Sequence, residues 1–297
     1  MKKLKLANTS LFLQSILYIF LSSTINAAGI HLEAMQMPAW LERNGEVSAL
    51  KPGLKLQAGD RIVTGGTGRV LLRIDESGFL KLGEDAHLDM DTLRSPVESD
   101  GALNAIFKVS RGALRFTAED SVFRHKIILH IGNIMATIRG KNTDIWGSAK
   151  TKNDTLCLIE GEIAVQSGND PEYIMDTKKS YYSVSREKHE HAVKSLPELK
   201  LTNWMSLTDL ESGSGVLVVN GGWAINLMSL AGKMNAKNIM QSMTSAGYPV
   251  EIESIDVQGQ GMYRLRINGF KSKDDASAFA DNFEGVGLIE RPWVAPL

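Results

Sequence analysis

The sequence lacks several features that would place it in a definite functional class. Among its 297 residues there is one cysteine, Cys157, so no internal disulfide can staple the fold, and its apolar surroundings predict a buried side chain. The formal net charge is −1, which argues against a strongly electrostatic partner such as duplex DNA. No phosphate-binding loop, nucleophile elbow or zinc-peptidase motif occurs, so neither an enzyme nor a cofactor is expected.

The chain also has no apolar run long enough to cross a bilayer comfortably. The longest, residues 11–21, follows a lysine-rich start and precedes small residues at Ala27 and Ala28. This pattern predicts a signal peptide over residues 1–28 and export to the periplasm. An uncleaved membrane anchor remains an alternative.

Short apolar or alternating runs, separated by Gly, Asp, Asn and Ser, fill residues 36–185. They predict an all-β domain, and the pattern does not distinguish a sandwich, a barrel and a solenoid. Turn residues mark Asp75–Gly78 and Glu160–Gly161, and the second pair is expected to close a hairpin.

A polar segment, residues 186–220, is predicted to be a linker because it contains mixed charges and the run Ser212-Gly213-Ser214-Gly215. It also contains His189-Glu190-His191. Two alternating histidines lack the further ligands that a closed metal site needs, so no metal is expected there.

Residues 221–297 have the periodicities of β-α-β-β-α-β. Ala236, Ile239, Met240 and Met243 repeat at helical spacing, and Ser272 with Asp275 forms a capping-box-like pair before a second helix. This order predicts one antiparallel sheet with both helices on the same side. The whole chain is therefore expected to be multidomain, with an all-β domain followed by an α+β domain.

One predicted strand, "QGMYRLRINGF" from Gln260 to Phe270, has two unlike faces. Side chains alternate along a strand, so one face of the sheet should meet the helices and the other should be open to water. The helix side is expected to hold Trp223, Ile225, Leu227, Tyr263, Leu265 and Ile267, and the open side Ala224, Asn226, Met228, Met262, Arg264 and Arg266. The open side suits a hydroxyl-rich or anionic polymer, although an ordinary solvated face has the same pattern.

The strands "WAINLMSL" and "YRLRINGFKSKDDA" resemble the first and third strands of the SPOR domain, a family that binds peptidoglycan. The resemblance implies a ferredoxin-like or RNP-like fold that recognises glycan strands without stem peptides, which accumulate at the division septum. It implies glycan-binding roles for Asn226, Ser229, Met262, Arg264 and Arg266, with Met262 standing where many members have an aromatic residue. The RNA-recognition fold shares the element order, but its stacked aromatics are missing here, so no nucleic acid partner is expected.

The runs "LKLQAGDRIVTGGTGRVLLRIDESGFLKLG", "ATIRGKNTDIWG" and "TLCLIEGEIAV" resemble a FecR domain, with departures at Ile74–Gly78 and Lys141. The resemblance implies a solenoid-like or sandwich-like β domain over residues 36–185. No cytoplasmic anti-sigma segment is apparent, so this domain is expected to be a scaffold, or a docking or sensing module for cell-division or envelope proteins.

Together these features predict a periplasmic, septal peptidoglycan-binding protein without enzymatic activity. The alternative is a periplasmic regulatory protein that acts through contacts of the FecR-like domain, with the C-terminal domain serving only as a tether.

Overall fold

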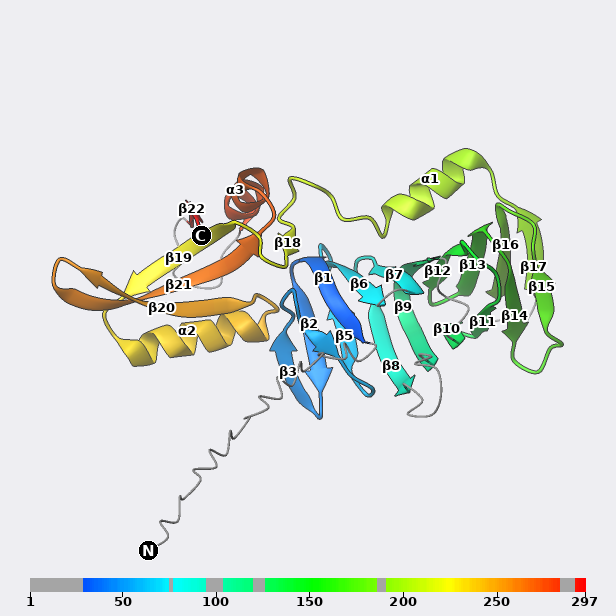
Figure 1. Ribbon diagram of the computed structural model, residues 1–297, viewed down its shortest axis with the longest axis horizontal. Helices are drawn as coiled ribbons and strands as arrows, with labels where there is room; N and C mark the ends of the chain where they lie inside the picture. Colours follow the sequence, from blue (N-terminus) through cyan, green and yellow to red (C-terminus); the bar gives the residue numbers. More distant parts are fainter. Residues whose placement is uncertain (1–28, 75–76, 95–103, 120–125, 186–190, 284–291) are drawn as a thin grey trace, which may run out of the picture.

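The computed structural model describes residues 29–297 except 75–76, 95–103, 120–125, 186–190 and 284–291. Two units lie side by side along the long axis of the molecule, an all-β unit and a smaller unit with helices on a sheet (Figure 1). The predicted signal peptide, residues 1–28, lies outside the described residues. The same holds for the side chains of His189 and His191.

The all-β unit consists of two sheets that share one long strand, β9 (Asn104–Ala118). In spatial order the first sheet contains β4 (Lys55–Leu56), β1 (Ile30–Gln36), β6 (Arg69–Ile74), β7 (Gly78–Leu82), the second half of β9, β12 (Asp144–Ala149), β13 (Asn153–Glu160), β16 (Ser180–Ser185) and β17 (His191–Ser195). The second contains β3 (Glu46–Ala49), β2 (Ala39–Arg43), β5 (Arg61–Thr64), β8 (His87–Arg94), the first half of β9, β10 (Lys126–Ile131), β11 (Ile134–Ile138), β14 (Ile163–Ser167) and β15 (Tyr173–Met175). Only the β9–β10 pair is parallel among these described ladders.

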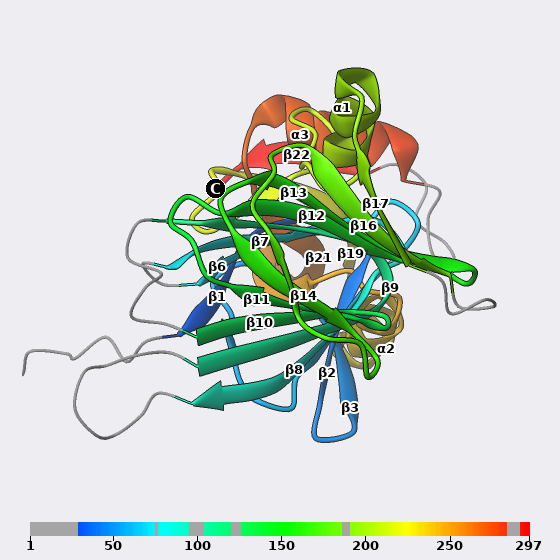
Figure 2. The ribbon, with the colours of Figure 1, turned by 90° about the vertical axis from the view of Figure 1, so that its right-hand side faces the viewer.

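The two sheets stack face to face, so this unit is a sandwich, one of the architectures that the strand pattern allowed. Figure 2 looks toward its far end, where β12, β13 and β16 lie above β10, β11 and β14. The core lies between the sheets and includes Phe107 and Phe116 from the two halves of β9, both fully buried. β9 changes sheets at Gly112, which has a φ of +90°, and a Cβ at this position would lie 2.5 Å from the Ala86 backbone, so only glycine fits.

The Glu160–Gly161 turn is not the hairpin that its residues predict. β13 pairs with β12 and β16 in the first sheet, whereas β14 pairs with β11 and β15 in the second. The turn therefore carries the chain from one sheet to the other. A left-handed glycine is needed at either kind of turn, and Gly161 has a φ of +92°.

The smaller unit has the predicted order β-α-β-β-α-β. Its elements are β19 (Trp223–Leu230), α2 (Lys233–Ser245), β20 (Val250–Val257), β21 (Gln260–Phe270), α3 (Lys273–Asn282) and β22 (Trp293–Pro296). The strands form an antiparallel sheet in the order β22–β19–β21–β20. Both helices pack on it through apolar side chains, including buried Ala236 and Met243 of α2 and Ala276 of α3.

Between the two units, the segment predicted as a linker contains secondary structure that packs against them. Helix α1 (Glu198–Ser206) covers the outer face of the first sheet, where Trp204 stacks on Trp146 at 4.6 Å between ring centroids and Leu201 is buried. The short strand β18 (Leu217–Val218) pairs with β1 on one side and with Phe270 of β21 on the other. Hydrogen-bonded strands thus connect the sandwich to the smaller sheet.

Further contacts hold the two units together. The Trp40 indole N–H donates to the Ser245 carbonyl at 2.9 Å, and the Ala39 N–H donates to the Gly247 carbonyl at 3.3 Å. Gly247 has a φ of +86°, and a Cβ there would approach Trp40 within 2.8 Å. One continuous hydrophobic core includes residues of both units. We conclude that they pack as one body.

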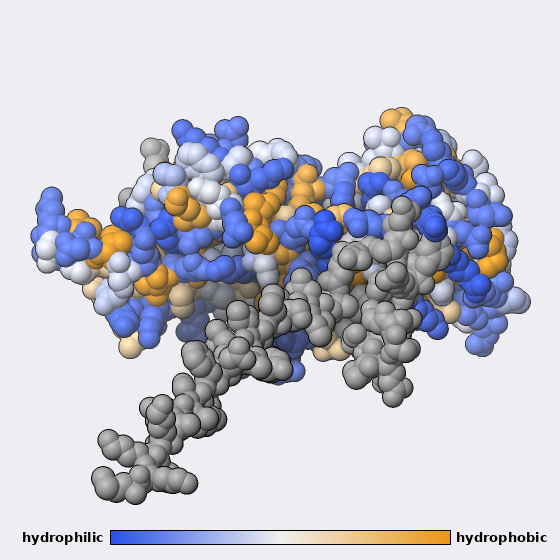
Figure 3. Space-filling view, viewed as in Figure 1, coloured by the Kyte–Doolittle hydropathy of each residue, from blue (hydrophilic) through white to orange (hydrophobic). Residues whose placement is uncertain are grey.

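None of the helices in the described residues has the length and apolarity needed to cross a membrane. Over the coloured atoms of Figure 3, hydrophilic residues predominate, and small apolar groups lie between them, several near the junction of the two units.

Candidate polar sheet face

The strand register assembles a polar cluster on the side of the smaller sheet that faces away from the helices. Residues directly opposite each other in antiparallel strands share a face. Arg266 of β21 lies between Glu251 of β20 and Asn226 of β19, and Trp293 of β22 lies on the other side of Asn226. These four residues form one row across the sheet.

A second row lies beside the first. There Arg264 of β21 lies between Glu253 of β20 and Ser229 of β19. We call the two rows together with Asn268, which continues the alternation of Arg264 and Arg266, the polar face. Of the residues predicted from the sequence, the structure brings together Asn226, Ser229, Arg264 and Arg266.

A bulge in β19 corrects the predicted alternation. Asn226 opposes Arg266 and Met228 opposes Leu265, so Leu227 is an extra residue between two consecutive pairs. Met228, expected on the open side, therefore packs into the hydrophobic core. The same shift places Ser229 opposite Arg264 on the polar face.

The polar face is less open than predicted. Asn226 is only 2% exposed, whereas the Arg266 and Arg264 side chains are 12% and 30% exposed and Trp293 is 44% exposed. The Glu251 and Glu253 side chains are 40% and 41% exposed, so a ligand approaching the sheet would meet Trp293, these two carboxylates and Arg264 before the other residues of the face. Asn226 is buried below these side chains.

Glu253 holds both guanidinium groups. Its Oε2 accepts from Arg266 Nη1 at 2.9 Å and lies 3.8 Å from Arg264 Nη1. The Arg264 guanidinium carbon also lies 5.8 Å from the centre of the Trp293 ring, within cation–π range. The Glu253 carboxylate and the Trp293 ring thus fix the orientation of the guanidinium groups before any ligand binds.

Glu251, at the end of the first row, has two partners. Its Oε2 accepts from Asn268 Nδ2 at 2.7 Å, and its Oε1 accepts from Lys51 Nζ of the sandwich. The Lys51 hydrogen bond is the largest influence that lowers the pKa of Glu251; burial opposes it, and Asn268 and Arg266 add to it. The carboxylate is therefore ionised at neutral pH.

Four buried polar atoms of the face have no hydrogen-bond partner among the described residues. They are Asn226 Oδ1, Asn268 Oδ1, Arg264 Nε and Arg266 Nε. Leaving such a group unpaired typically costs about 1–3 kcal/mol. These two acceptors and two donors are concentrated on one sheet face, and because each atom is buried, a ligand would pair with them only after the side chains that cover them move.

Met262 continues the alternation of Arg264 and Arg266 at the end of the polar face, beyond the residues that β19 contributes. It pairs with Ile255 of β20, one position beyond Leu230–Tyr263, the last pair that β21 makes with β19. The polar face contains an aromatic side chain from another strand, Trp293, which sequence reasoning did not select. The sequence contains this tryptophan in "RPWV", close to the C-terminal end of the segment 221–297, where the order β-α-β-β-α-β predicts a last strand.

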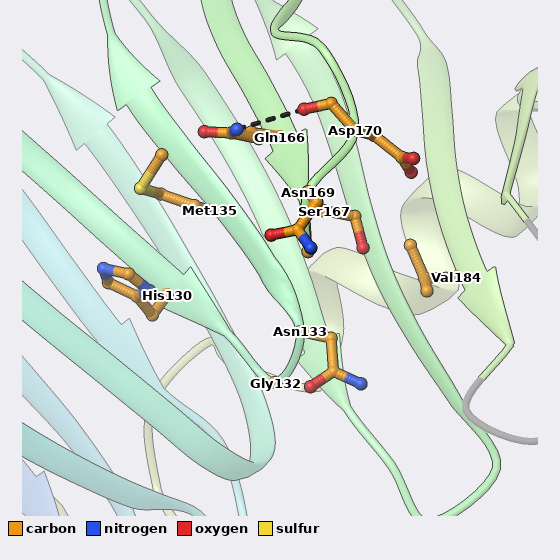
Figure 4. Close-up of a pocket in the computed structure, with 10 residues that line it drawn as sticks. His130, Gly132, Asn133, Met135, Gln166, Ser167, Asn169, Asp170 and Val184 are labelled. Atoms are coloured by element: carbon orange, nitrogen blue, oxygen red, sulfur yellow. Dashed lines mark hydrogen bonds between the residues drawn. The ribbon is translucent and has the colours of Figure 1, made fainter. Parts of the chain in front are cut away.

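A second candidate is a cavity of about 630 Å³ in the sandwich, between the β10–β11 and β14–β15 turns (Figure 4). Amide and hydroxyl side chains line it, including Asn133, Gln166 and Ser167, and Gln166 Nε2 donates to the Asp170 carbonyl at 3.0 Å. Burial, and then the charge of Lys108, lowers the pKa of His130 at its edge. In the described part of the chain, no buried side-chain atom of this cavity lacks a partner, in contrast to the polar face.

Cys157 does not provide a reactive thiol. It is fully buried in β13, and burial, with a smaller effect of the Asp144 charge, raises its pKa to about 12. A thiolate is therefore essentially absent at neutral pH, and the residue behaves as a small hydrophobe.

Comparison with known proteins identifies the smaller unit. Residues 219–294 match the family model of the SPOR domain, a binding domain of cell-envelope proteins that implies peptidoglycan binding and no catalysis. No family model reports a FecR domain before it, and no curated protein matches the chain.

Two crystal structures described as a "putative anti-sigma factor" from Parabacteroides distasonis resemble the chain weakly. The first, at 1.65 Å resolution, has 13% identity and a TM-score of 0.38 over 49% of this chain and 64% of that chain. The second, at 2.50 Å, has 10% identity and a TM-score of 0.40 over 75% and 90%. The chain thus spans less than two thirds of the first structure, and both similarities are too weak to indicate a function.

Proposed function

We propose that this protein binds the glycan strands of peptidoglycan through the polar face. The observation that carries the proposal is the first row, which includes Arg266, Asn226 and Trp293, on the side away from the helices of a sheet that matches the SPOR family. Four strands spaced about 4.8 Å apart make this row about 14 Å long, so it suits an extended polymer rather than a single small molecule.

The chemistry of the face fits a polysaccharide that carries amides and carboxylates. Arg264 and Arg266 can donate to N-acetyl carbonyls, and a guanidinium binds a carboxylate most strongly. Trp293 offers an exposed, flat apolar surface for the C–H side of a sugar ring. Ser229, which lies opposite Arg264 and is only partly buried, can donate to and accept from hydroxyl groups.

The two guanidinium groups favour denuded strands, from which the stem peptides have been removed. Removing a stem peptide from its lactyl group leaves a free carboxylate, which is the partner that an arginine binds best. We propose that the protein is exported to the periplasm by the segment 1–28 and concentrates at the division septum, where the SPOR resemblance implies that denuded strands accumulate. The sandwich would be a FecR-like scaffold or docking module held at that site.

Co-sedimentation with purified sacculi, with and without amidase treatment, tests the proposal. We expect the chain to pellet, and to pellet more on amidase-treated sacculi. Arg264→Ala should weaken binding about tenfold and Trp293→Ala about fivefold, the sizes expected for a charged hydrogen bond and a ring contact.

Arg139→Ala is the matched control, because Arg139 is an exposed arginine of the sandwich that pairs with Glu172 at 2.6 Å. It should pellet like the wild type. Equal pelleting of the wild type, Arg264→Ala and Trp293→Ala would contradict the assignment of the face, and absence of pelleting by the wild type would contradict the function.

One observation favours the second candidate, a regulatory protein that acts through contacts of the sandwich. The outermost strands β15 and β17 expose Tyr173, Ile174 and Val193 at 49%, 40% and 44%. Exposed apolar residues on edge strands suit protein docking. Septal fluorescence of a fusion protein that persists in the Arg264→Ala/Trp293→Ala double variant would favour this candidate, whereas diffuse fluorescence of that variant would favour glycan binding.

A further inference from the structure

The sandwich contributes a charged side chain to the polar face of the smaller unit. Lys51 lies between β3 and β4, and its ammonium group binds Glu251 Oε1 at the end of the first row. Lys51 therefore extends a continuous set of polar contacts that runs from the sandwich through Glu251 to Asn268.

The backbone around Lys51 is fixed with respect to the polar face. Leu50 is fully buried, and its N–H donates to the Ala39 carbonyl at 3.0 Å, while the Gly53 N–H donates to the Leu32 carbonyl at 2.7 Å. Ala39 in turn donates to Gly247 of the smaller unit. Lys51 thus projects toward Glu251 from a rigid base rather than from a flexible loop.

The number of positive and negative side chains on the polar face indicates what Lys51 does. Within the smaller unit, two carboxylates, Glu251 and Glu253, face two guanidinium groups, Arg264 and Arg266. Glu253 already engages both guanidiniums. If Glu251 were not held by a cation from elsewhere, it would compete with a ligand for Arg266, directly opposite, and would repel an anionic ligand.

We propose that Lys51 is a positioning residue through which the sandwich tunes glycan binding, by binding Oε1 of Glu251 and neutralising its charge beside Arg266. The ligand class is a glycan that carries free carboxylates, and the inference rests on the proposed function. The dominant effect of Lys51 on the lowered pKa of Glu251 agrees with this close pairing.

Co-sedimentation of full-chain variants with amidase-treated sacculi tests the inference. Lys51→Gln should weaken binding about three- to fivefold, the range typical of an exposed ion pair. Lys51→Arg should retain binding. Glu251→Gln removes the competing carboxylate and provides the background in which the effect of Lys51 is measured again.

The decisive variant is Lys51→Gln/Glu251→Gln. If Lys51 acts through Glu251, the double variant should bind like Glu251→Gln, a rescue that a merely structural role of Lys51 would not produce. Lys178→Gln is the control, because Lys178 forms an exposed ion pair with Glu160 at 2.6 Å in the sandwich. It should bind like the wild type.

Two results would overturn the inference. In the first, Lys51→Gln binds like the wild type. In the second, Lys51→Gln weakens binding by the same factor whether residue 251 is Glu or Gln. The second result would mean that Lys51 contacts the glycan directly. Both leave the proposed function intact, since that function fails only if the wild type does not bind or if Arg264→Ala and Trp293→Ala bind normally.

Discussion

Replacing Asp275 should loosen the connection between the two units more than any neighbouring substitution. Asp275 is 1% exposed in the first turn of α3. Its Oδ1 accepts from the N–H groups of Gly213 and Val216 at 2.8 and 3.1 Å, and its Oδ2 accepts from Ser272 Oγ at 2.5 Å. One carboxylate thus ties the segment before β18 to the helix.

The magnitude follows from those three hydrogen bonds. A hydrogen bond to a charged group contributes about 1.5–3 kcal/mol, and Asp275→Ala leaves the Val216 N–H buried without its acceptor. We expect the free energy of unfolding to fall by about 3–5 kcal/mol. Asp275→Asn retains the Oδ1 acceptor and should cost about 1–2 kcal/mol.

Urea unfolding followed by tryptophan fluorescence and far-UV circular dichroism measures these changes. Asp274→Ala is the matched control, because Asp274 is an exposed carboxylate in the same helical turn, and its loss should cost about 0.5 kcal/mol. Comparable destabilisation by Asp275→Ala and Asp274→Ala would refute the role assigned to the buried carboxylate.

Three further predictions concern other parts of the chain. The Cys157 thiol, with its pKa of about 12, should not react with Ellman's reagent in the folded protein and should react on unfolding; reaction at the same rate in both states would contradict its burial. Trp204→Ala should lower the free energy of unfolding by about 2–3 kcal/mol through loss of the Trp146 stack, whereas Leu199→Ala, at a site 75% exposed, should have almost no effect in the same urea titration. The lowered pKa of Glu251 means that its ionised form stabilises the fold above its unfolded pKa of about 4.3 and that this stabilisation is lost as the pH falls through the lower folded pKa. The difference in stability between the wild type and Glu251→Gln should therefore shrink on acidification, and a difference that grows would contradict the pairing with Lys51.

The element order of the smaller unit was predictable because its signals are local. Helical spacing identified Ala236 and Met243, which are buried in α2, and Ser272 caps α3 by accepting from the Asp275 N–H at 3.0 Å. The partners of the Asp275 carboxylate were not predictable, because Gly213 and Val216 are about 60 residues distant in the chain and meet it only in the folded protein.

The composition of the polar face was predictable only in part. Strand alternation placed Arg264 and Arg266 on one side of β21, as the register has them. The bulge at Leu227 depends on how β19 meets β21, and nothing in "WAINLMSL" marks it. Trp293 joins the site because the last strand pairs with the first, a contact that residue types alone do not specify.

The same distinction applies to the sandwich. Turn residues predicted a reversal at Glu160–Gly161, but whether the following strand returns to the same sheet depends on pairings with distant strands. The Ser-Gly composition of residues 186–220 predicted a linker. The packing of α1 instead depends on the stacking of Trp204 on Trp146, a contact with a distant strand of the first sheet. The predicted domain boundaries, 36–185 and 221–297, stay predictions.

The most direct test of glycan binding by the polar face is the tryptophan indole N–H region of the NMR spectrum. The chain has five tryptophans, and Trp293→Phe assigns the signal of Trp293. During titration with denuded glycan strands, we predict that the Trp293 signal shifts or broadens while those of Trp40, Trp146 and Trp204 stay unchanged. An unchanged Trp293 signal at glycan concentrations that saturate co-sedimentation would contradict the account.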